Sequence, residues 1–495
     1  MSKIIIQNGN MCELDLPLKF AQKLYNEFAI RHPNAFYLRT RQRGMQNWDG
    51  KIHYITKTGQ FKIGLLPKVY DRCIEMGIKP KVVDMRQPLP KVSKVVTKIG
   101  KYKLRPEQEK AVKAVINNTI GGKPFHIGVL DYTVNAGKTL IMSSLYLSYK
   151  KQLKTLLITN DSDWLNQARE EFKQYLPGED ITFVQGKVLN WSNFTIGMVQ
   201  SISRNMRFYQ KELSQIDMVL IDEADQGGSR QYQNVITRLF NTRIRIGLSG
   251  TIYMSKLAKD KVKNMNLECF FGKVLAEFKL RDSIKKGYST KTVVKMVPGK
   301  PWYGNWESDC ISYKEIYDDS ITNSYTAWLM AYSRLRWNIN QGRYPALVVC
   351  KHIAHCENLY KFFKKKLGDA YNIAYVHVNT KSKLRQQIMK DFRDGKIDIL
   401  VSTTIIARGK NFPKLRYLLN AASMDSQEKS IQFLGRLVRT DKSKKKVYLD
   451  DLHYPGNYLD RHGKHRKQYY QRQELKVILL DKLWKKHPNH SLIKS

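Results

Sequence analysis

The eight residues Tyr132-Thr-Val-Asn-Ala-Gly-Lys-Thr139 have the composition of a loop that binds phosphate groups. Such a loop needs backbone N–H groups curled around the phosphates, a lysine that reaches the β- and γ-phosphates, and a hydroxyl that binds Mg²⁺. Lys138 and Thr139 suit the last two tasks, and Asn135 tolerates the left-handed backbone conformation that a tight loop uses. The strict pattern GxxxxGK(S/T) is not met, because Tyr132 stands where its first glycine would be. The alternative is a chance tetrapeptide in a helix cap.

Acidic residues that directly follow an apolar run supply a second element of the same chemistry. The run Met218-Val-Leu-Ile-Asp-Glu-Ala-Asp225 is typical of a buried strand that ends in carboxylates. Asp222 at the strand terminus can hold Mg²⁺, and Glu223 can polarise an attacking water. A solvated acidic turn is the commoner fate of such acids, but this chain is short of acids. Together the two elements predict nucleotide hydrolysis.

A third element lies near the end of the chain, in Gln432-Phe-Leu-Gly-Arg-Leu-Val-Arg439. The spacing places Arg436 and Arg439 three residues apart, which predicts one face of a helix. Such a pair can stabilise charge on a γ-phosphate, as arginine fingers do. On this segment alone the alternative is favoured, namely a basic helix face on a basic protein.

The charge of the chain favours a polyanionic partner. Its 495 residues include 86 Lys+Arg and 43 Asp+Glu, which leaves a net charge of +43. Nucleic acid is the leading candidate for the counterion, and an anionic membrane surface is the weaker one because no lipidation motif is present. We expect no membrane association, since no apolar run approaches the roughly 20 residues that span a bilayer.

The cellular setting is predicted from the cysteines and the first residues. The 6 cysteines contain no CxxC pair, which is typical of a reducing interior rather than a disulfide framework. The first residues lack the apolar stretch of a signal peptide. We therefore expect a cytoplasmic protein, in the host cytoplasm if it is encoded by a phage.

The alternation of short apolar runs with helical stretches predicts an α/β fold. Runs such as Leu156–Thr159 and Ala346–Val349 read as buried strands of parallel sheets that helices cover on both faces. The texture occurs twice, which predicts two tandem domains after a small N-terminal α+β module. The expected domains are 1–96, 97–287 and 288–454, followed by a basic helical C-terminal tail at 455–495.

Read in order, these segments resemble the superfamily 2 helicases of the DEAD/DExH type. Leu104-Arg-Pro-Glu-Gln108 resembles the adenine-reading Q motif, and Asp222-Glu-Ala-Asp225 spells the DEAD box. Ser249-Gly-Thr251 resembles the coupling motif of the first domain, and Ser402–Asn411 resembles the coupling and strand-binding motif of the second. The resemblance implies two RecA-like domains, with ATP and Mg²⁺ as cofactors.

The resemblance also implies which residues form the nucleotide site. The implied catalytic residues are Lys138, Glu223, Gln432, Arg436 and Arg439. The implied nucleotide-binding residues are Arg105, Gln108, Asn135, Ala136, Gly137, Lys138, Thr139, Asp222 and Gly409, with Thr139 and Asp222 on Mg²⁺.

A narrower similarity is to the UvsW-type phage recombination helicases. It rests on the Ala-Gly-Lys of the phosphate loop, on the segment Lys351–His355, and on the turn Asn47-Trp-Asp-Gly50 with two arginines before it. It implies a DNA helicase or translocase that remodels branched or forked DNA by branch migration, fork regression, and removal of R-loops or D-loops. The implied setting is recombination, repair and replication, with the protein acting as a monomer. An RNA helicase that unwinds locally is the alternative, and a scaffold with a decayed ATPase is a third reading.

Nucleic-acid contacts are expected mainly to the backbone, because the chain has many cations and no helix with a base-reading signature. The expected contact residues are Arg41, Arg43, Trp48, Lys51, Gln167 and Arg408. Trp48 could stack on an exposed base, although packing under its own hairpin is somewhat favoured. The loop Trp302–Trp306 is a candidate strand-separating wedge, with burial in a domain seam as the favoured alternative. A zinc site at Cys350–Cys356 is disfavoured against structural packing, since no second ligand cluster accompanies it.

Overall fold

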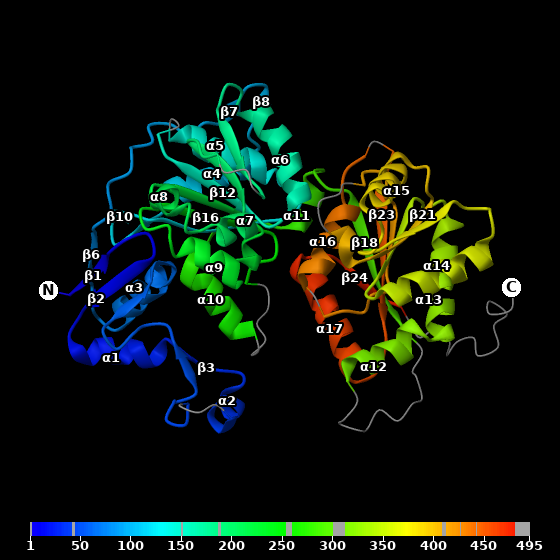
Figure 1. Cartoon of the computed structure of the whole chain (residues 1–495), viewed down its shortest axis with the longest axis horizontal. Helices are drawn as coiled ribbons and strands as arrows, with labels where there is room; N and C mark the ends of the chain where they lie inside the picture. Colours follow the sequence, from blue (N-terminus) through cyan, green and yellow to red (C-terminus); the bar gives the residue numbers. More distant parts are fainter. Residues whose placement is uncertain are drawn as a thin grey trace. The chain divides into compact units, whose positions relative to one another are not determined.

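The computed structural model describes residues 2–41, 45–149, 152–186, 190–253, 260–299, 312–407, 412–425, 427–441 and 443–480. Contacts divide the chain into two compact units. Unit 1 comprises Met1–Tyr132 and Ala136–Phe278, and unit 2 comprises Thr133–Asn135 and Lys279–Ser495. Each unit is built around a seven-stranded sheet (Figure 1).

The large sheet of unit 1 is parallel throughout, in the order β13-β14-β12-β15-β16-β11-β17. Its strands are β11 His126–Tyr132, β12 Thr155–Thr159, β13 Ile181–Val184, β14 Phe194–Met198, β15 Met218–Asp222, β16 Ile244–Ser249 and β17 Val274–Phe278. The helices that follow the N-terminal module are α4 Pro106–Ile116, α5 Lys138–Ser148, α6 Ser162–Tyr175, α7 Val199–Arg204, α8 Gln210–Ser214, α9 Arg230–Ile236 and α10 Lys261–Phe271. Every residue of β11, β12, β15 and β16 is buried, so the prediction of a parallel sheet covered on both faces is confirmed.

The N-terminal module carries a mixed four-stranded sheet in the order β5-β2-β1-β6. Its strands are β1 Lys3–Ile6, β2 Met11–Asp15, β5 Gln60–Lys62 and β6 Lys81–Asp84, and its helices are α1 Leu18–Glu27, α2 Ala35–Arg41 and α3 Leu66–Glu75. A separate hairpin joins β3 Ala29–Arg31 to β4 Lys51–His53. Short pairs are formed by β7 Lys98–Ile99 with β8 Tyr102–Lys103 and by β9 Thr119–Ile120 with β10 Lys123–Pro124.

The N-terminal module shares a hydrophobic core with the large sheet of unit 1. A fully buried arginine on β16, Arg245, reinforces this junction. Its guanidinium donates to the carbonyl of Gly9 at 2.6 Å, to Oδ1 of Asn10 at 2.7 Å and to the carbonyl of Phe270 at 3.1 Å. Because a buried guanidinium is costly unless it is hydrogen-bonded, these contacts fix the module in one orientation on the sheet.

Unit 2 contains a second all-parallel sheet, in the order β20-β21-β19-β22-β23-β18-β24. Its strands are β18 Lys291–Pro298, β19 Ala346–Cys350, β20 Ile373–Val376, β21 Ile399–Thr403, β22 Tyr417–Asn420, β23 Lys446–His453 and β24 Val477–Leu479. Its helices are α11 Leu280–Lys285, α12 Tyr313–Tyr317, α13 Tyr325–Ile339, α14 Ile353–Leu367, α15 Ser382–Asp394, α16 Gln427–Leu437 and α17 Asn457–Arg472, with a π-helical turn at Asp318–Thr322. One hydrophobic cluster lies between the sheet and α15, α16 and α17, and another lies between the sheet and α12, α13 and α14 (Figure 1).

The C-terminal part of the chain is only partly the helical tail that the sequence predicts. α17 is helical, but Val477–Leu479 pairs with β18 as strand β24, so the expectation of an all-helical tail is wrong there. The run Val-Ile-Leu has high β-propensity and continues the parallel sheet at its edge. Residues 481–495 lie outside the described part.

Part of the predicted basic tail is also buried, on α17. Arg466 is 0% exposed and donates to Asp451 Oδ1, to the Met424 carbonyl and to the Leu452 carbonyl at 2.9–3.0 Å. Tyr470, also buried, donates its hydroxyl to Asp451 Oδ2 at 2.7 Å. These two residues therefore hold the helix on the sheet and are not a solvent-facing track for nucleic acid.

Among the residues that the structure describes, no helix is both long enough and apolar enough to cross a bilayer.

Candidate active site

The phosphate loop lies between the end of β11 and the start of α5, as its sequence predicts. Lys138 is the first residue of α5, and Gly137 precedes it in the left-handed conformation, with φ 71° and ψ 48°. Asn135 also has a positive φ of 63°, which confirms the prediction that this position needs a residue tolerant of that conformation. The two left-handed residues turn the chain sharply into the N-terminus of α5, where backbone N–H groups and the helix dipole favour an anion.

Gln108, an expected nucleotide-site residue on α4, contacts the phosphate loop. Gln108 is 2% exposed; its Oε1 accepts from the Arg105 backbone N–H at 2.9 Å and its Nε2 donates to the Ala136 carbonyl at 2.8 Å. A Cβ at Gly137 would come within 2.3 Å of that Nε2, so glycine is required there. Gln108 thus ties the start of α4 to the phosphate loop, a link that no local pattern in the sequence reveals.

Tyr132 explains the departure from the strict glycine pattern. It is the last residue of β11, its ring is fully buried, and its hydroxyl donates to the Glu107 carbonyl at 2.7 Å. The position therefore anchors α4 to β11 instead of approaching the ligand. The loop closes through Asn135 and Gly137, so a glycine at Tyr132 is not needed for the turn.

Asp222 and Lys138 occupy one electrostatic environment. Asp222 ends β15 and is 7% exposed. Burial raises the pKa of Asp222, the nearby Lys138 lowers it, and the carboxylates of Asp225 and Asp161 raise it further. Two further acids near a buried carboxylate favour a cation at this point, and Lys138 supplies one positive charge. The carboxylate and the Thr139 hydroxyl are oxygen donors of the type that Mg²⁺ prefers.

Glu223 follows Asp222 with a left-handed backbone, at φ 53° and ψ 51°. A glutamate in this region is uncommon and costs of the order of 1 kcal/mol, which is typical of residues held in place by function. This backbone conformation turns the chain immediately after β15, at the carboxyl edge of the sheet.

A hydrogen-bond chain connects the acidic motif to the end of the next strand. Asp225 is buried and accepts from the Ser249 hydroxyl at 2.7 Å. The Ser249 hydroxyl oxygen lies 3.1 Å from the Thr251 hydroxyl and accepts from the Thr251 backbone N–H at 3.1 Å. The predicted coupling segment Ser249–Thr251 therefore contacts the acidic motif directly.

In unit 2, the expected arginine motif is only partly helical. Gln432 and Arg436 lie on α16, but the helix ends at Leu437, so the prediction that Arg439 shares a helical face with Arg436 is wrong. The helix stops because the chain turns toward β18, where Thr290 N donates to the Val438 carbonyl at 2.8 Å and the Thr290 hydroxyl donates to the Arg439 carbonyl at 3.1 Å.

Sequence reasoning missed the residue that closes α16. Lys444 is buried, and its Nζ donates to the carbonyls of Leu437 and Leu415, each at 3.0 Å. Burial is the main cause that lowers the pKa of Lys444 to about 8. A cation at a helix C-terminus satisfies carbonyls that have no partner within the helix. Lys444 therefore fixes the end of the segment that carries Arg436 and Arg439.

Several expected contact residues do not join a site in the described structure. Arg43, Arg408, Gly409 and the loop Trp302–Trp306 lie outside the described residues. Gln167 is exposed on α6, and its Nε2 donates to Glu171 at 2.6 Å.

The N-terminal hairpin and α2 enclose a basic pocket of about 580 Å³. Lys51, an expected contact, lines it, together with Arg31, Arg39 and the exposed ring of Phe36. Asp49 also lines the pocket, but its carboxylate is engaged by His53 Nε2 at 2.7 Å and by the Lys51 backbone N–H at 2.9 Å. Sequence reasoning missed Arg31 and Arg39; the pairing of Arg31 with Lys51 across the hairpin becomes visible only once the register is known.

Arg41 and Trp48 flank this pocket in sequence. Arg41 ends α2, and its guanidinium lies 4.9 Å from the centroid of the Tyr37 ring. Trp48 is partly exposed; its indole N–H donates to the Lys51 carbonyl at 2.8 Å and its ring lies edge-on to His32 at 5.7 Å. Trp48 thus contacts its own hairpin, as the favoured alternative expects, while its stacking on a base stays a prediction.

The segment Cys350–Cys356 is a packing element. His355 is fully buried, with its Nδ1 3.1 Å from the Tyr317 hydroxyl, and Cys356 Sγ lies 3.9 Å from the Val376 carbonyl. In the ranges that the structure describes, no group of three or more His, Cys, Asp or Glu side chains comes together as metal ligands do.

His355 predicts an acid sensitivity of unit 2. Burial lowers the pKa of His355 from 6.5 to about 3. Because the pKa of His355 is lower in the folded state than in the unfolded state, the unfolded state binds a proton first as the pH falls. The free energy of unfolding is therefore fully retained above pH 6.5 and falls by about 1.4 kcal/mol per pH unit as the pH drops toward 3. We expect His355→Gln to remove about this slope from the unfolding free energy measured by denaturant titration between roughly pH 6 and pH 4. An unchanged slope would show that another group causes the acid sensitivity.

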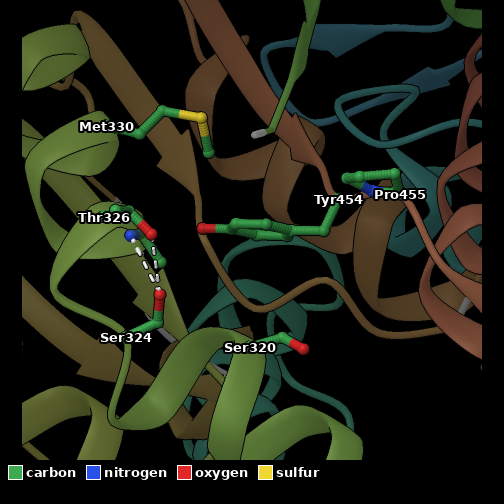
Figure 2. Close-up of a pocket in the computed structure, with 7 residues that line it drawn as sticks. Ser320, Ser324, Thr326, Met330, Tyr454 and Pro455 are labelled. Carbon is green, nitrogen blue, oxygen red and sulfur yellow. Dashed lines mark hydrogen bonds between the residues drawn. The ribbon is translucent and has the colours of Figure 1, made fainter. Parts of the chain in front are cut away.

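Figure 2 shows a second, much smaller cavity in unit 2, between the π-helical turn, the start of α13 and Tyr454. Ser320 and Tyr454 line it, with the Tyr454 hydroxyl pointing toward Ser324 and Thr326, and its volume is about 20 Å³. That volume holds roughly one water molecule, and small-molecule ligands need several hundred Å³. The cavity is therefore not a nucleotide pocket.

Two family models match the chain. Residues 101–254 match the model described as type III restriction enzyme, res subunit, and residues 331–441 match the helicase conserved C-terminal domain. Together the matches cover more than half of the chain, and they contain the phosphate loop, the acidic motif and the arginine motif. The chain belongs to the superfamily 2 helicases, the enzymes that couple ATP hydrolysis to the unwinding of nucleic acid.

Individual relatives are distant. Helicase 22 of Sulfolobus islandicus filamentous virus (isolate Iceland/Hveragerdi) is 23% identical over 385 residues, which are 71% of this chain and 64% of that protein. The chain thus spans less than two thirds of this curated relative. The T4 UvsW structure is 18% identical to this chain. The match covers 97% of this chain and 98% of that chain, with a TM-score of 0.44. The structure of the restriction-modification enzyme LlaBIII bound to DNA is 13% identical. The match covers 86% of this chain and 35% of that chain, with a TM-score of 0.58.

Proposed function

We propose that this chain is an ATP-driven helicase or translocase that acts on branched or forked DNA. The observation that carries the ATP part is the meeting of Lys138, at the start of α5, with the buried carboxylate of Asp222 at the end of β15. A lysine beside a left-handed turn and an acid at the adjoining sheet edge are the two groups that phosphoryl transfer from a nucleotide needs most.

In this proposal the phosphate loop and the residues at the ends of β15 and β16 divide the work of hydrolysis. The loop Asn135–Lys138 binds the phosphates, and the Thr139 hydroxyl and Asp222 would hold Mg²⁺, which would supply charge neutralisation at the phosphate oxygens. Glu223 orients and polarises the attacking water. The bond Asp225–Ser249 carries the change in ligation to Thr251. Gln432, Arg436 and Arg439 of unit 2 remain proposed groups of the same reaction.

The nucleic-acid part of the proposal is supported by charge and shape. The net charge of +43 favours a polyanion. In the N-terminal module, Arg31, Arg39 and Lys51 line one pocket with an exposed Phe36, which combines phosphate-binding cations with a ring on which a splayed base can stack. An exposed ring within a basic pocket suits the junction of a fork, where bases lose their stacking partners.

The double variant Arg39→Gln/Lys51→Gln tests this pocket. We expect affinity for forked DNA to fall roughly tenfold at low salt, because two exposed phosphate contacts of up to about 1 kcal/mol each are lost. Equilibrium titration with a labelled fork measures it. The matched control is Lys19→Gln/Lys23→Gln, two exposed lysines of α1 in the same module that do not line the pocket. Equal affinities of the two variants would remove the pocket from the DNA path.

A further inference from the structure

Unit 2 carries a cluster of cations packed on aromatic rings, which we call the β18–α13 patch. It consists of Lys295, Arg334, Trp337, Arg343, Lys446 and Tyr448. The Arg343 guanidinium lies 3.6 Å from the centroid of the Tyr448 ring and 4.7 Å from that of Trp337. Lys295 Nζ and the Arg334 guanidinium lie 4.8 Å and 5.0 Å from the same Trp337 centroid. Trp337 is 43% exposed. Its indole thus holds three cations in place at the surface.

The positive charge of this patch is largely uncompensated. The carboxylate that acts on it, Asp450, accepts hydrogen bonds from Arg334 Nε at 2.8 Å, from Asn338 Nδ2 at 3.1 Å and from the Tyr417 hydroxyl at 3.1 Å. Within the part of the chain that the structure describes, no ion pair joins a carboxylate to Lys295, Arg343 or Lys446. Burial lowers the pKa of Lys295, and its neighbours Arg334, Arg343 and Lys446 lower it further, against the opposing effect of Asp450.

Crowding of this kind costs free energy unless an anion relieves it. Elsewhere in unit 2, cations meet acids: Lys364 pairs with Asp369 at 2.7 Å and Lys396 pairs with Asp391 at 3.6 Å. The patch differs from these ordinary surface pairs because, among the described residues, only Arg334 of its cations pairs with a carboxylate. Lys295, Arg343 and Lys446 lie against aromatic rings instead, and Arg343 also donates to Asn338 Oδ1 at 2.9 Å. A row of phosphates is the ligand that such fixed donors match best.

The patch lies on the face of the sheet opposite the arginine motif. Tyr448 packs with the cluster formed by α12, α13 and α14, whereas α16 packs with the other cluster (Figure 1). On β18, Val294 and Met296 face the α16 side, so Lys295 between them faces the α13 side. The patch is therefore separated by the whole sheet from Gln432 and Arg436 and is not part of the nucleotide site.

We propose that the β18–α13 patch binds the phosphate backbone of a duplex DNA arm, as a second DNA contact on unit 2. The choice of DNA as the ligand rests on the function proposed above. Contacts from lysine and arginine to phosphates carry no sequence information, so this contact is independent of sequence and reads only the spacing of phosphates. Its role is to hold an arm of the substrate while the motor acts elsewhere.

The test compares duplex binding by the full chain carrying Lys295→Gln/Lys446→Gln with that of the wild type, without nucleotide, between about 50 and 200 mM salt. The probe is a labelled blunt duplex. Loss of two phosphate contacts should reduce the slope of log affinity against log salt by about 1.8, at about 0.9 per contact. The matched control is Lys364→Gln/Lys396→Gln, which removes the same charge from ion-paired sites of unit 2 and should retain a slope close to the wild type.

Equal slopes for the two double variants would overturn the proposal. A patch that binds a protein ligand instead of DNA would give this result. Lys446→Gln alone, at the exposed first position of β23, should reduce the slope by about 0.9 and guards against misfolding of the double variant. Thermal unfolding confirms that each variant is folded. The motor function and the patch can fail separately. If DNA does not stimulate wild-type ATP turnover, the proposed motor function fails. If the patch variant still shows the reduced salt slope, the proposal that the patch binds duplex DNA is retained.

Discussion

Lys138→Ala is expected to reduce ATP turnover on the order of a thousandfold while DNA binding is retained. Lys138 begins α5 directly after the left-handed Gly137, and its charge is felt by the buried Asp222. Alanine removes the cation that would neutralise the phosphates, and loss of one well-placed electrostatic contact in a site of this kind costs about 10²–10³ in rate. Phosphate release under saturating ATP and fork DNA measures the effect.

The control for this variant is Lys113→Ala on α4, whose lysine pairs with Glu109 at 2.6 Å on the exposed side of the helix. It should turn over ATP at nearly the wild-type rate, since it removes one charge from unit 1 without touching the phosphate loop. If Lys138→Ala kept more than about a tenth of wild-type turnover, the assignment of the phosphate loop would be wrong.

Arg466→Met should produce the largest loss of stability. Arg466 and Asp451 are both fully buried, and the guanidinium also donates to the carbonyls of Met424 and Leu452. Methionine fills much of the volume but leaves Asp451 as a buried charge without its partner, which costs about 3–5 kcal/mol. We expect the unfolding of unit 2 to shift down by on the order of 10 °C in a calorimetric scan.

A double variant separates charge from packing at this site. Asp451→Asn/Arg466→Met removes both charges, so it should recover a substantial part of the stability lost by Arg466→Met alone. A double variant less stable than the single one would show that shape and hydrogen bonding, not the isolated carboxylate, determine the loss.

The local part of the nucleotide site could be predicted from sequence because its signals are local. The apolar run before Asp222, and the Asn-Ala-Gly-Lys sequence between a strand and a helix, each specify both an element and its end. Asn135 and Gly137 take the left-handed conformations that their residue types allow. The parallel sheets followed from buried runs of strand length, which few other folds use in alternation with helices.

Long-range partners could not be predicted, because nothing in the local pattern encodes them. Gln108 reaches Ala136 across 28 positions, and Arg245 reaches Gly9 across 236. Arg466 lies in the basic tail that the sequence predicts, between Lys464 and Lys467, yet it is buried against Asp451. The end of α16 before Arg439 depends on a hydrogen bond to Thr290, which lies in another part of the chain.

The central claim is that ATP hydrolysis at the loop of Lys138 drives work on branched DNA. The most direct measurement is the rate of ATP hydrolysis by the full chain with equal concentrations of single-stranded, duplex, forked and four-way DNA, an RNA–DNA hybrid, and structured RNA. The account predicts the strongest stimulation by forked or four-way DNA and little by RNA. Stimulation by RNA equal to or above that by forks, or the same rate with and without any nucleic acid, would contradict it.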